Sequence, residues 1–249
     1  MGASSGSAAR ATVVLVHGAW HGAWCWERVL GGLSTAGVDA LAVDLPGHGA
    51  DPGPLSDLHG DAARVRSTLD RVEGPVVLLG HSYGGAVVTE AGTHPNVAHV
   101  VYLAAFALDE GESCAGAATE AALSISHDER PDLVAGFEYG PEGSVTLEAS
   151  VAAACLYNDC DRATTEWAVG RLGPQPLVTL QQAPSGIAWK KVPSTYVVCL
   201  HDQAIHPDFQ RTLARRCTTT LEWPTDHSPF LSRPELLVDL LSELAAATR

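Results

Sequence analysis

The sequence predicts an α/β protein with a mostly parallel sheet of about six strands, flanking helices and a helical cap insertion. Three observations predict this fold. Short apolar runs alternate with longer amphipathic stretches, which is typical of βαβ units. One apolar run enters a Gly-x-Ser-x-Gly turn, Gly80–Gly84, and is followed by a helix-capable segment. The alternation stops between residues 108 and 191 and then resumes, which indicates an insertion.

The predicted strands are short runs, and all but the last are rich in Val and Leu, as expected for strands of a parallel sheet. They are Thr12–His17, Val38–Leu45, Pro75–Gly80, Val97–Ala105, Ser194–Leu200 and Thr218–Trp223. The predicted helices are Trp24–Ala36, Leu58–Val72 and Pro234–Ala247. Apolar residues recur at helical spacing in the second helix, and the third begins with proline, which is favoured at the first helical position.

The segment 108–191 is rich in Ala, Gly, Glu and Pro and holds two helical patches, Val145–Leu156 and Ala163–Leu172. We therefore expect a core made of residues 1–107 and 192–249 and a helical cap, or lid, made of residues 108–191. The cap is expected to cover the carboxyl end of the sheet, where sites form in open α/β folds. A subdomain that serves packing alone is the alternative interpretation.

Composition excludes several classes of protein. A net charge of −14 over 249 residues argues against nucleic acid or an anionic membrane as a partner. No apolar run reaches the ~20 residues of a membrane span, and the first ten residues lack the apolar centre of a signal peptide. The six cysteines are scattered and form no Cys-x-x-Cys pair, which favours reduced thiols and a cytoplasmic protein. The expected partner is a small-molecule substrate, and a homodimer is left open.

Ser82 is the candidate nucleophile because it lies at the centre of the Gly-x-Ser-x-Gly turn between a strand and a helix. In such a nucleophile elbow the backbone is strained and the flanking positions, here Gly80 and Gly84, have no room for a Cβ atom. The hydroxyl is then exposed at a helix N-terminus, where backbone N–H groups stabilise an oxyanion.

A serine hydroxyl needs a base, and the base needs an acid that orients it. His227 is the candidate base because it follows the last predicted strand. Asp202 is the candidate acid because it directly follows the strand Ser194–Leu200. Asp109, after an earlier strand, is an alternative acid, whereas Asp226 adjoins the base and is expected to have a structural role.

The oxyanion is expected to bind two backbone N–H groups, those of Ala19 and Tyr83. Gly18 permits a close approach of the loop that follows the first strand, and His17 is expected to organise this loop through hydrogen bonds. His17 and His21 have the i, i+4 spacing of a metal pair, but Gly18 between them disfavours a helix. We expect no metal and no cofactor.

Several residues are candidates for substrate binding because we expect them near the mouth of the predicted site. They are Gly18, Trp20, Phe106, Trp167 and Phe230. Aromatic side chains would suit an apolar or aryl acyl group, and core packing is the alternative for each of them.

Six blocks of the sequence resemble the α/β-hydrolase superfamily, in the branch of salicylate-binding-type methylesterases and hydroxynitrile lyases. These blocks are Val14–Trp26, Asp44–Gly49, Gly80–Gly85, Tyr102–Phe106, Tyr196–Asp202 with Ile205, and Asp226–Phe230. The resemblance extends over nearly the whole chain. It implies the α/β-hydrolase fold, a Ser-His-Asp triad and Asp202 as the triad acid.

The chain also departs from this branch at positions that bear on chemistry. The lyases typically have threonine where this chain has Gly18 and a lysine directly after the catalytic histidine, where it has Ser228. The absence of that cation disfavours cyanohydrin cleavage. Relatives usually have glutamate before the acid, where this chain has His201. The turn Pro46–Gly49 is typical of bacterial hydrolases, and we interpret it as a turn feature.

The leading hypothesis is therefore a serine esterase that cleaves a carboxylic ester of a small apolar or aryl molecule through an acyl-enzyme intermediate. A lyase or cyclase of specialised metabolism, which would use the same triad for proton abstraction and elimination, is an alternative. A non-catalytic ligand-binding protein with a hydrolase fold is a third, and the presence of all three triad residues disfavours it.

Overall fold

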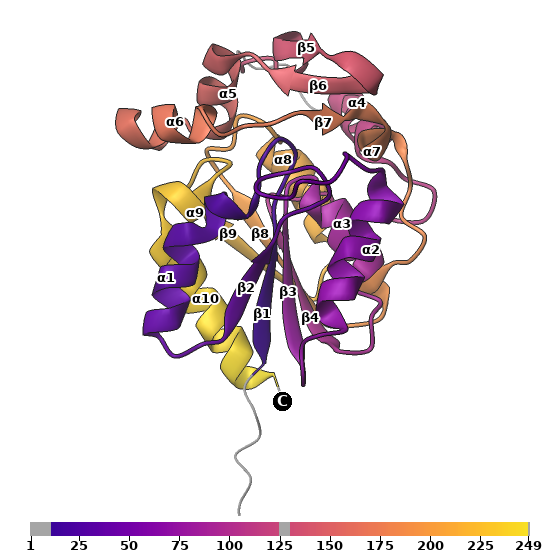
Figure 1. Cartoon of the computed structure of the whole chain (residues 1–249), viewed down its shortest axis with the longest axis vertical. Helices are drawn as coiled ribbons and strands as arrows, with labels where there is room; N and C mark the ends of the chain where they lie inside the picture. The colour runs from indigo at the N-terminus through magenta and orange to yellow at the C-terminus, as the bar shows by residue number, and fades with distance from the viewer. Residues whose placement is uncertain (1–10, 125–129, 249) are drawn as a thin grey trace, which may run out of the picture.

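A six-stranded parallel sheet forms the centre of the computed structural model, which describes residues 11–124 and 130–248 (Figure 1). The strand order is β2-β1-β3-β4-β8-β9. The strands are β1 (Thr12–Val16), β2 (Ala40–Val43), β3 (Val76–His81), β4 (Val97–Leu103), β8 (Ser194–Cys199) and β9 (Thr219–Trp223). The predicted α/β fold class is confirmed, and each predicted strand agrees with an observed one to within two residues at either end.

Helices cover both faces of this sheet, which explains why the central strands are apolar without interruption. In Figure 1, α1 (Glu27–Thr35) and α10 (Pro234–Ala247) lie on one face, and α2 (Leu58–Leu69) and α3 (Gly84–Ala91) lie on the other. All six residues of β3 and all eight of α3 are buried. The shorter elements of this part of the chain are the 3-10 helix η1 (Ala23–Trp26), α8 (Pro207–Ala214), which packs on β8, and α9 (Pro229–Ser232).

The segment between β4 and β8 lies above the carboxyl ends of the strands (Figure 1). Its helices are α4 (Cys114–Ser124), α5 (Ala149–Leu156), α6 (Arg162–Val169) and α7 (Leu177–Gln181), with short 3-10 turns at Val134–Gly136, Pro141–Gly143 and Ala188–Lys190. It also contains a three-stranded antiparallel sheet, which the sequence analysis did not predict. The strands of this sheet are β5 (Phe137–Tyr139), β6 (Ser144–Leu147) and β7 (Gln175–Pro176).

The helix predicted at Val145–Leu156 was wrong in its first turn. Residues 144–147 form a strand, and the helix starts at Ala149. The carboxylate of Glu148 accepts hydrogen bonds from the N–H groups of Ser150 and Val151 and so caps the helix. Val145 and Leu147 are buried in β6 whereas Thr146 is exposed, which is the alternation of a strand.

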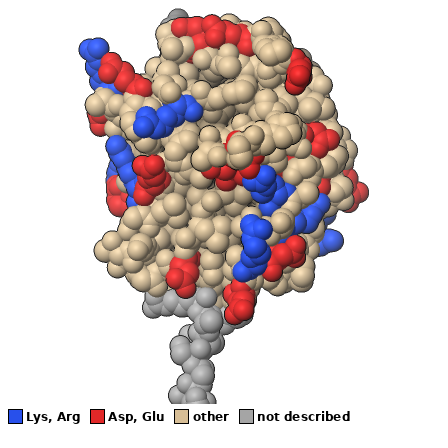
Figure 2. Space-filling model, in the orientation of Figure 1, with Lys and Arg blue, Asp and Glu red and all other residues tan. Residues whose placement is uncertain are grey.

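The surface carries charges of both signs. Figure 2 shows basic side chains close to acidic ones on the face in view. The structure contains several ion pairs between such side chains, for example Arg211 with Glu222 at 2.7 Å. Between residues 11 and 248, with 125–129 set aside, no helix combines the length and apolarity needed to cross a membrane. The same residues include no group of three or more His, Cys, Asp or Glu side chains placed to bind a metal ion. All six cysteines are free thiols.

Candidate active site

Four loops that follow parallel strands meet at one edge of the sheet, below the segment 108–191 (Figure 1). Parallel strands end at the same edge, so residues far apart in sequence come together there. The loop after β1 carries Ala19, the turn after β3 carries Ser82, and the loops after β8 and β9 carry Asp202 and His227.

The turn after β3 has the strained geometry of a nucleophile elbow. Ser82 has φ = 53°, an uncommon value for a residue other than glycine. A Cβ atom on Gly80 would lie 2.4 Å from the carbonyl oxygen of Gly84, and one on Gly84 would lie 2.5 Å from that of His17. Both positions therefore require glycine. Ser82 is partly exposed, although His81 and Tyr83 beside it are buried.

Hydrogen bonds hold the backbone of this turn. The N–H of Ser82 donates to the carbonyl of Leu103 (3.2 Å), and the carbonyl of Ser82 accepts from the N–H groups of Gly85 (2.9 Å) and Phe106 (3.1 Å). These contacts join β3, α3 and the end of β4, so the surrounding structure stabilises the strained serine.

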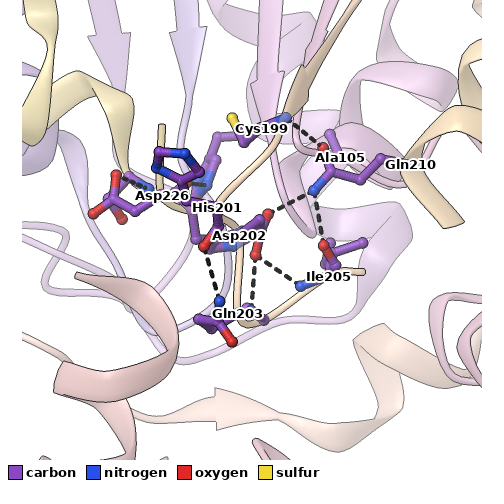
Figure 3. A network of polar contacts seen from close by, with 12 residues as sticks. Ala105, Cys199, His201, Asp202, Gln203, Ile205, Gln210 and Asp226 are labelled. Atoms are coloured by element: carbon purple, nitrogen blue, oxygen red, sulfur yellow. Dashed lines mark hydrogen bonds and ion pairs between the residues drawn. The ribbon is translucent and has the colours of Figure 1, made fainter. Parts of the chain in front are cut away.

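Asp202 and His227 form a buried hydrogen-bonded pair. Nδ1 of His227 lies 2.7 Å from Oδ2 of Asp202, and both side chains are almost fully buried. A carboxylate only accepts hydrogen bonds, so the hydrogen is on Nδ1 and the lone pair of Nε2 is free to take a proton. Oδ1 of Asp202 accepts from the N–H groups of Ala204 (2.7 Å) and Ile205 (2.9 Å), which fixes the carboxylate (Figure 3).

Gln210, on α8, also holds Asp202, and sequence reasoning missed it. Its Nε2 donates to Oδ2 of Asp202 and to the carbonyl of Ile205, both at 2.8 Å, while its Oε1 accepts from the N–H of Cys199 at 2.9 Å (Figure 3). Gln210 is fully buried. Nothing in the local sequence marks it, because its partners lie in a loop and a strand outside its own helix.

The other two carboxylates near the site have different partners. Asp109 pairs with Lys190, and this hydrogen bond lowers the pKa of Asp109. Asp226 accepts from the N–H of Ser228 (3.2 Å) and from the hydroxyl of Ser232 (2.7 Å) and so braces the loop that carries the histidine. This contact agrees with the structural role expected for Asp226.

The loop after β1 is organised by two histidines that act as hydrogen-bonding groups. Nε2 of His17 accepts from the N–H of Leu45 (3.2 Å), so its Nδ1 carries the hydrogen and donates to the carbonyl of Gly18 (2.9 Å). Nδ1 of His21 lies 2.8 Å from the carbonyl of Ala19. Burial holds the pKa of His17 well below its usual value and lowers that of His21 to about 4, so both rings are neutral.

These contacts set the direction of the Ala19 N–H. The carbonyl of Gly18 and the N–H of Ala19 belong to one planar peptide group and point in opposite directions. Because His17 holds the carbonyl, the N–H is directed away from His17. Within residues 11–124 and 130–248, neither the N–H of Ala19 nor that of Tyr83 has a hydrogen-bond acceptor. Two preorganised donors are therefore left free.

The predicted substrate-binding aromatics fall into two groups. Trp20 is next to Ala19 in the loop after β1, and its ring lies 5.7 Å from that of Phe137 in the segment above the sheet. Phe106 follows β4, and its N–H bonds to Ser82 as described above. Trp167 is more distant, because its ring packs 5.3 Å from Trp24, over η1 at the side of the core.

For Phe230 the structure favours the alternative of core packing. The side chain has no exposed surface, and its ring lies 4.9 Å from Trp26 and 4.8 Å from His81. His81 in turn bonds through Nε2 to the carbonyl of His227 at 2.8 Å. Phe230 therefore packs in the core beside His81, which bonds to His227, and it is not among the substrate contacts that we propose.

A turn between α5 and α6 contacts three of the four loops. The hydroxyl of Tyr157 bonds to Nε2 of His21 at 2.8 Å. Asp159 contacts Nδ1 of His201 at 2.8 Å, and its N–H donates to Asp226 at 3.2 Å. His201, which departs from the related branch, thus attaches the loop of Asp202 to the segment above the sheet.

Tyr83, the second predicted oxyanion donor, is anchored by a buried carboxyl group. Its hydroxyl donates to Oδ2 of Asp61, on α2, at 2.6 Å, and both side chains are almost fully buried. Burial raises the pKa of Asp61 to about 7. Oδ1 of Asp61 has no partner among the described residues, and it is the atom that would carry the proton.

This elevated pKa predicts a dependence of stability on pH. In the unfolded chain the carboxyl group of Asp61 ionises near pH 4, whereas in the folded protein this carboxyl group keeps its proton up to about pH 7. Between these values the folded state binds more protons, so the free energy of unfolding falls as the pH rises. Asp61→Asn keeps an acceptor for Tyr83 and cannot ionise. We expect its Tm to exceed that of the wild type at pH 8 by more than at pH 5.

Thermal unfolding followed by circular dichroism at both pH values measures this difference. Asp39→Asn is the matched control, because Asp39 is exposed and its carboxylate has no role in the site. An equal Tm difference at pH 5 and pH 8 for Asp61→Asn would show that Asp61 ionises normally in the folded protein.

Comparison with known proteins finds relatives of this chain in both sequence and fold. The model of the alpha/beta hydrolase family matches residues 13–240. The chain is 30% identical to Methylesterase 7 of Arabidopsis thaliana, over 93% of this chain and 95% of that protein. It is 28% identical to the alpha/beta hydrolase nvfD of Aspergillus novofumigatus (94% and 96%). Its fold is similar to the crystal structure of polyneuridine aldehyde esterase, with a TM-score of 0.82 at 24% identity (95% and 99%).

Proposed function

Because this chain belongs to the alpha/beta hydrolase family, we propose that it is a serine esterase that cleaves a carboxylic ester of a small molecule. The observation that carries the proposal is the convergence of a strained, partly exposed Ser82, the buried Asp202–His227 pair and two free backbone N–H groups at one sheet edge. The match to a methylesterase over nearly the whole chain supports ester hydrolysis in particular.

In the proposed reaction, Oγ of Ser82 attacks the ester carbonyl carbon and transfers its proton to Nε2 of His227. Asp202 stabilises the imidazolium that forms. The carbonyl oxygen becomes an oxyanion and binds the N–H groups of Ala19 and Tyr83, and the loss of one such donor typically costs about 3 kcal/mol of transition-state stabilisation. The tetrahedral intermediate expels the alcohol, which takes the proton from His227.

Water then attacks the acyl-enzyme with His227 as the base, and the collapse of the second intermediate releases the acid and restores Ser82. No metal or cofactor takes part in this scheme. The cytoplasm is the compartment that we propose, because its reducing conditions keep thiols free and the six cysteines are free thiols.

We further propose that residues 108–191 act as a cap over the core of residues 1–107 and 192–249 and select an apolar or aryl acyl group. Trp20 and Phe106 border the site, and β5 and β6 of the cap pack near Trp20. Removing apolar area from water contributes ~25 cal/mol per Å², which is enough to favour an aryl over an acetyl group by roughly 100-fold.

A panel of methyl and p-nitrophenyl esters tests this function. The acyl group is varied from acetyl to long-chain and aryl, and kcat/KM is measured for each. The proposal predicts hydrolysis that rises with apolar acyl area. Hydrolysis of no member of the panel would contradict the esterase function, and a series that is flat or falls from acetyl onward would contradict the apolar cap alone.

Gly18 is expected to be essential for this activity. A Cβ atom at this position would lie 2.8 Å from Cβ of Ser82 and 2.9 Å from Nδ1 of His81. The loop would have to shift away from Ser82 and move the Ala19 N–H with it. We expect Gly18→Ala to lower kcat by ~100-fold or more, which is the typical effect of losing one oxyanion donor.

Gly31→Ala is the matched control, because a Cβ atom there meets nothing within 4 Å. Its kcat is expected to equal that of the wild type. A Gly18→Ala variant with wild-type kcat would show that this loop does not supply an oxyanion donor.

A further inference from the structure

Trp20, the residue after the proposed oxyanion donor Ala19, is held almost entirely by the cap. Its N–H donates to Oε1 of Gln175 (3.3 Å), its carbonyl accepts from the N–H of Gly173 (2.8 Å), and its indole Nε1 donates to the carbonyl of Val145 (3.2 Å). Trp20 has φ = 64°, which is rare for a large side chain and persists only where the surroundings impose it. The cap contacts supply that constraint.

Gln175 is the most strongly fixed of these partners. The side chain is fully buried on β7, and its Nε2 donates to the hydroxyl of Thr179 at 2.7 Å. That hydroxyl donates to the carbonyl of Pro176 at 2.6 Å, so it must accept from Gln175. This chain of donors sets the amide orientation and directs Oε1 towards Trp20.

The same oxygen of Gln175 also meets His48, in the turn Pro46–Gly49 that the catalytic scheme leaves without a role. Nε2 of His48 lies 3.0 Å from Oε1 of Gln175, and its Nδ1 lies 3.0 Å from the carbonyl of Pro46. One buried amide of the cap thus joins two loops of the core.

We propose that Gln175 is a positioning residue that holds the Ala19–Trp20 peptide, and with it the oxyanion donor, in the productive orientation. The inference rests on the proposed function. The N–H of Trp20 and the carbonyl of Ala19 lie in one peptide plane, which Gln175 holds on one side and His21 on the other. The donor N–H of Ala19 belongs to the preceding peptide group, which shares the Cα atom of Ala19. A rotation of the Ala19–Trp20 peptide plane therefore displaces this N–H.

The substitution Gln175→Met tests the proposal, because methionine has a similar length and lacks the acceptor oxygen. A displacement of about 1 Å at a reacting centre can cost 10²-fold in rate, so we expect kcat to fall by ~10- to 100-fold with little change in KM. The affinity for a trifluoromethyl ketone, whose tetrahedral adduct carries an oxyanion, should fall in parallel. A purely structural role would lower Tm without this split between kcat and KM.

Gln182→Met is the matched control. Gln182 is another glutamine of this segment that bonds to the core, through the N–H of Leu58 (2.9 Å) and the carboxylate of Asp57 (3.1 Å), at the start of α2. The same substitution there breaks a contact of the cap with the core away from Trp20, and kcat should remain within twofold of the wild type. Gln175→Glu retains the acceptor and should have a higher kcat than Gln175→Met.

The outcomes separate this inference from the function on which it rests. A wild-type protein that hydrolyses no ester would overturn the proposed function. If the wild type is active and Gln175→Met stays within twofold of it in kcat and in affinity for the ketone, the inference is overturned and the proposed function stands. If Gln175→Met does not fold, Gln175→Asn keeps an amide but shortens the side chain by one methylene group, which withdraws the acceptor oxygen from Trp20; a fall in kcat at constant KM supports the inference, and an unchanged kcat refutes it.

Discussion

Replacement of Ser82 with alanine is expected to lower ester turnover by at least ~10⁴-fold while the fold is retained. Alanine keeps the Cβ atom, so the strain at φ = 53° is the same in both proteins. Only the hydroxyl is lost, and without it no acyl-enzyme forms. The measurement is kcat on the best ester of the panel, with circular dichroism as the check on folding.

Labelling with an organophosphonate tests independently whether Ser82 is the nucleophile. Mass spectrometry of the labelled wild type should locate the probe on the peptide that contains Ser82, and Ser82→Ala should remain unlabelled. The exposed Ser34, replaced with alanine, is the control and should be labelled like the wild type. A probe located on another residue would remove Ser82 from its proposed role.

Replacement of Asp202 with asparagine is expected to lower kcat by roughly 10³- to 10⁴-fold. The amide would place its NH2 group against Nδ1 of His227 and favour the tautomer with hydrogen on Nε2, which cannot accept the proton of the serine. KM should change little, because Asp202 is fully buried below the site.

The control for this prediction is Asp109→Asn. Asp109 is the alternative acid of the sequence analysis, and the structure pairs it with Lys190. Its loss should change kcat by less than twofold. A larger effect from Asp109→Asn than from Asp202→Asn would reverse the assignment of the acid.

The parts of the fold that were predicted correctly are those with strong local signals. The strand β3 is a continuous apolar run, and the glycines on either side of Ser82 leave room only for a tight turn. The positions of Asp202 and His227 followed from the rule that parallel strands end at one edge. The structure brings these two side chains into contact, 2.7 Å apart.

The parts that were missed depend on contacts between distant segments. Gln175 lies 155 residues from Trp20 in sequence, and no local pattern marks it as a partner. The strand β6 is short and runs directly into α5, so the helical pattern of the following residues extended over it.

The aromatic candidates illustrate the same limit. Trp20 lies in the loop after β1 and Phe230 in the short helix α9 after β9, but Trp20 packs against Phe137 of the cap and Phe230 packs on Trp26 in the core. Residue type predicts burial of an aromatic ring and not the side of the site on which it is buried.

The most direct test of the proposed esterase is hydrolysis in water labelled with ¹⁸O, followed by mass spectrometry of the released acid. An acyl-enzyme on Ser82 that is cleaved by water places one ¹⁸O atom in each acid molecule after a single turnover, and the alcohol retains its original oxygen. A released acid without ¹⁸O would instead indicate elimination or cleavage of the alkyl–oxygen bond, and it would contradict the acyl-enzyme mechanism.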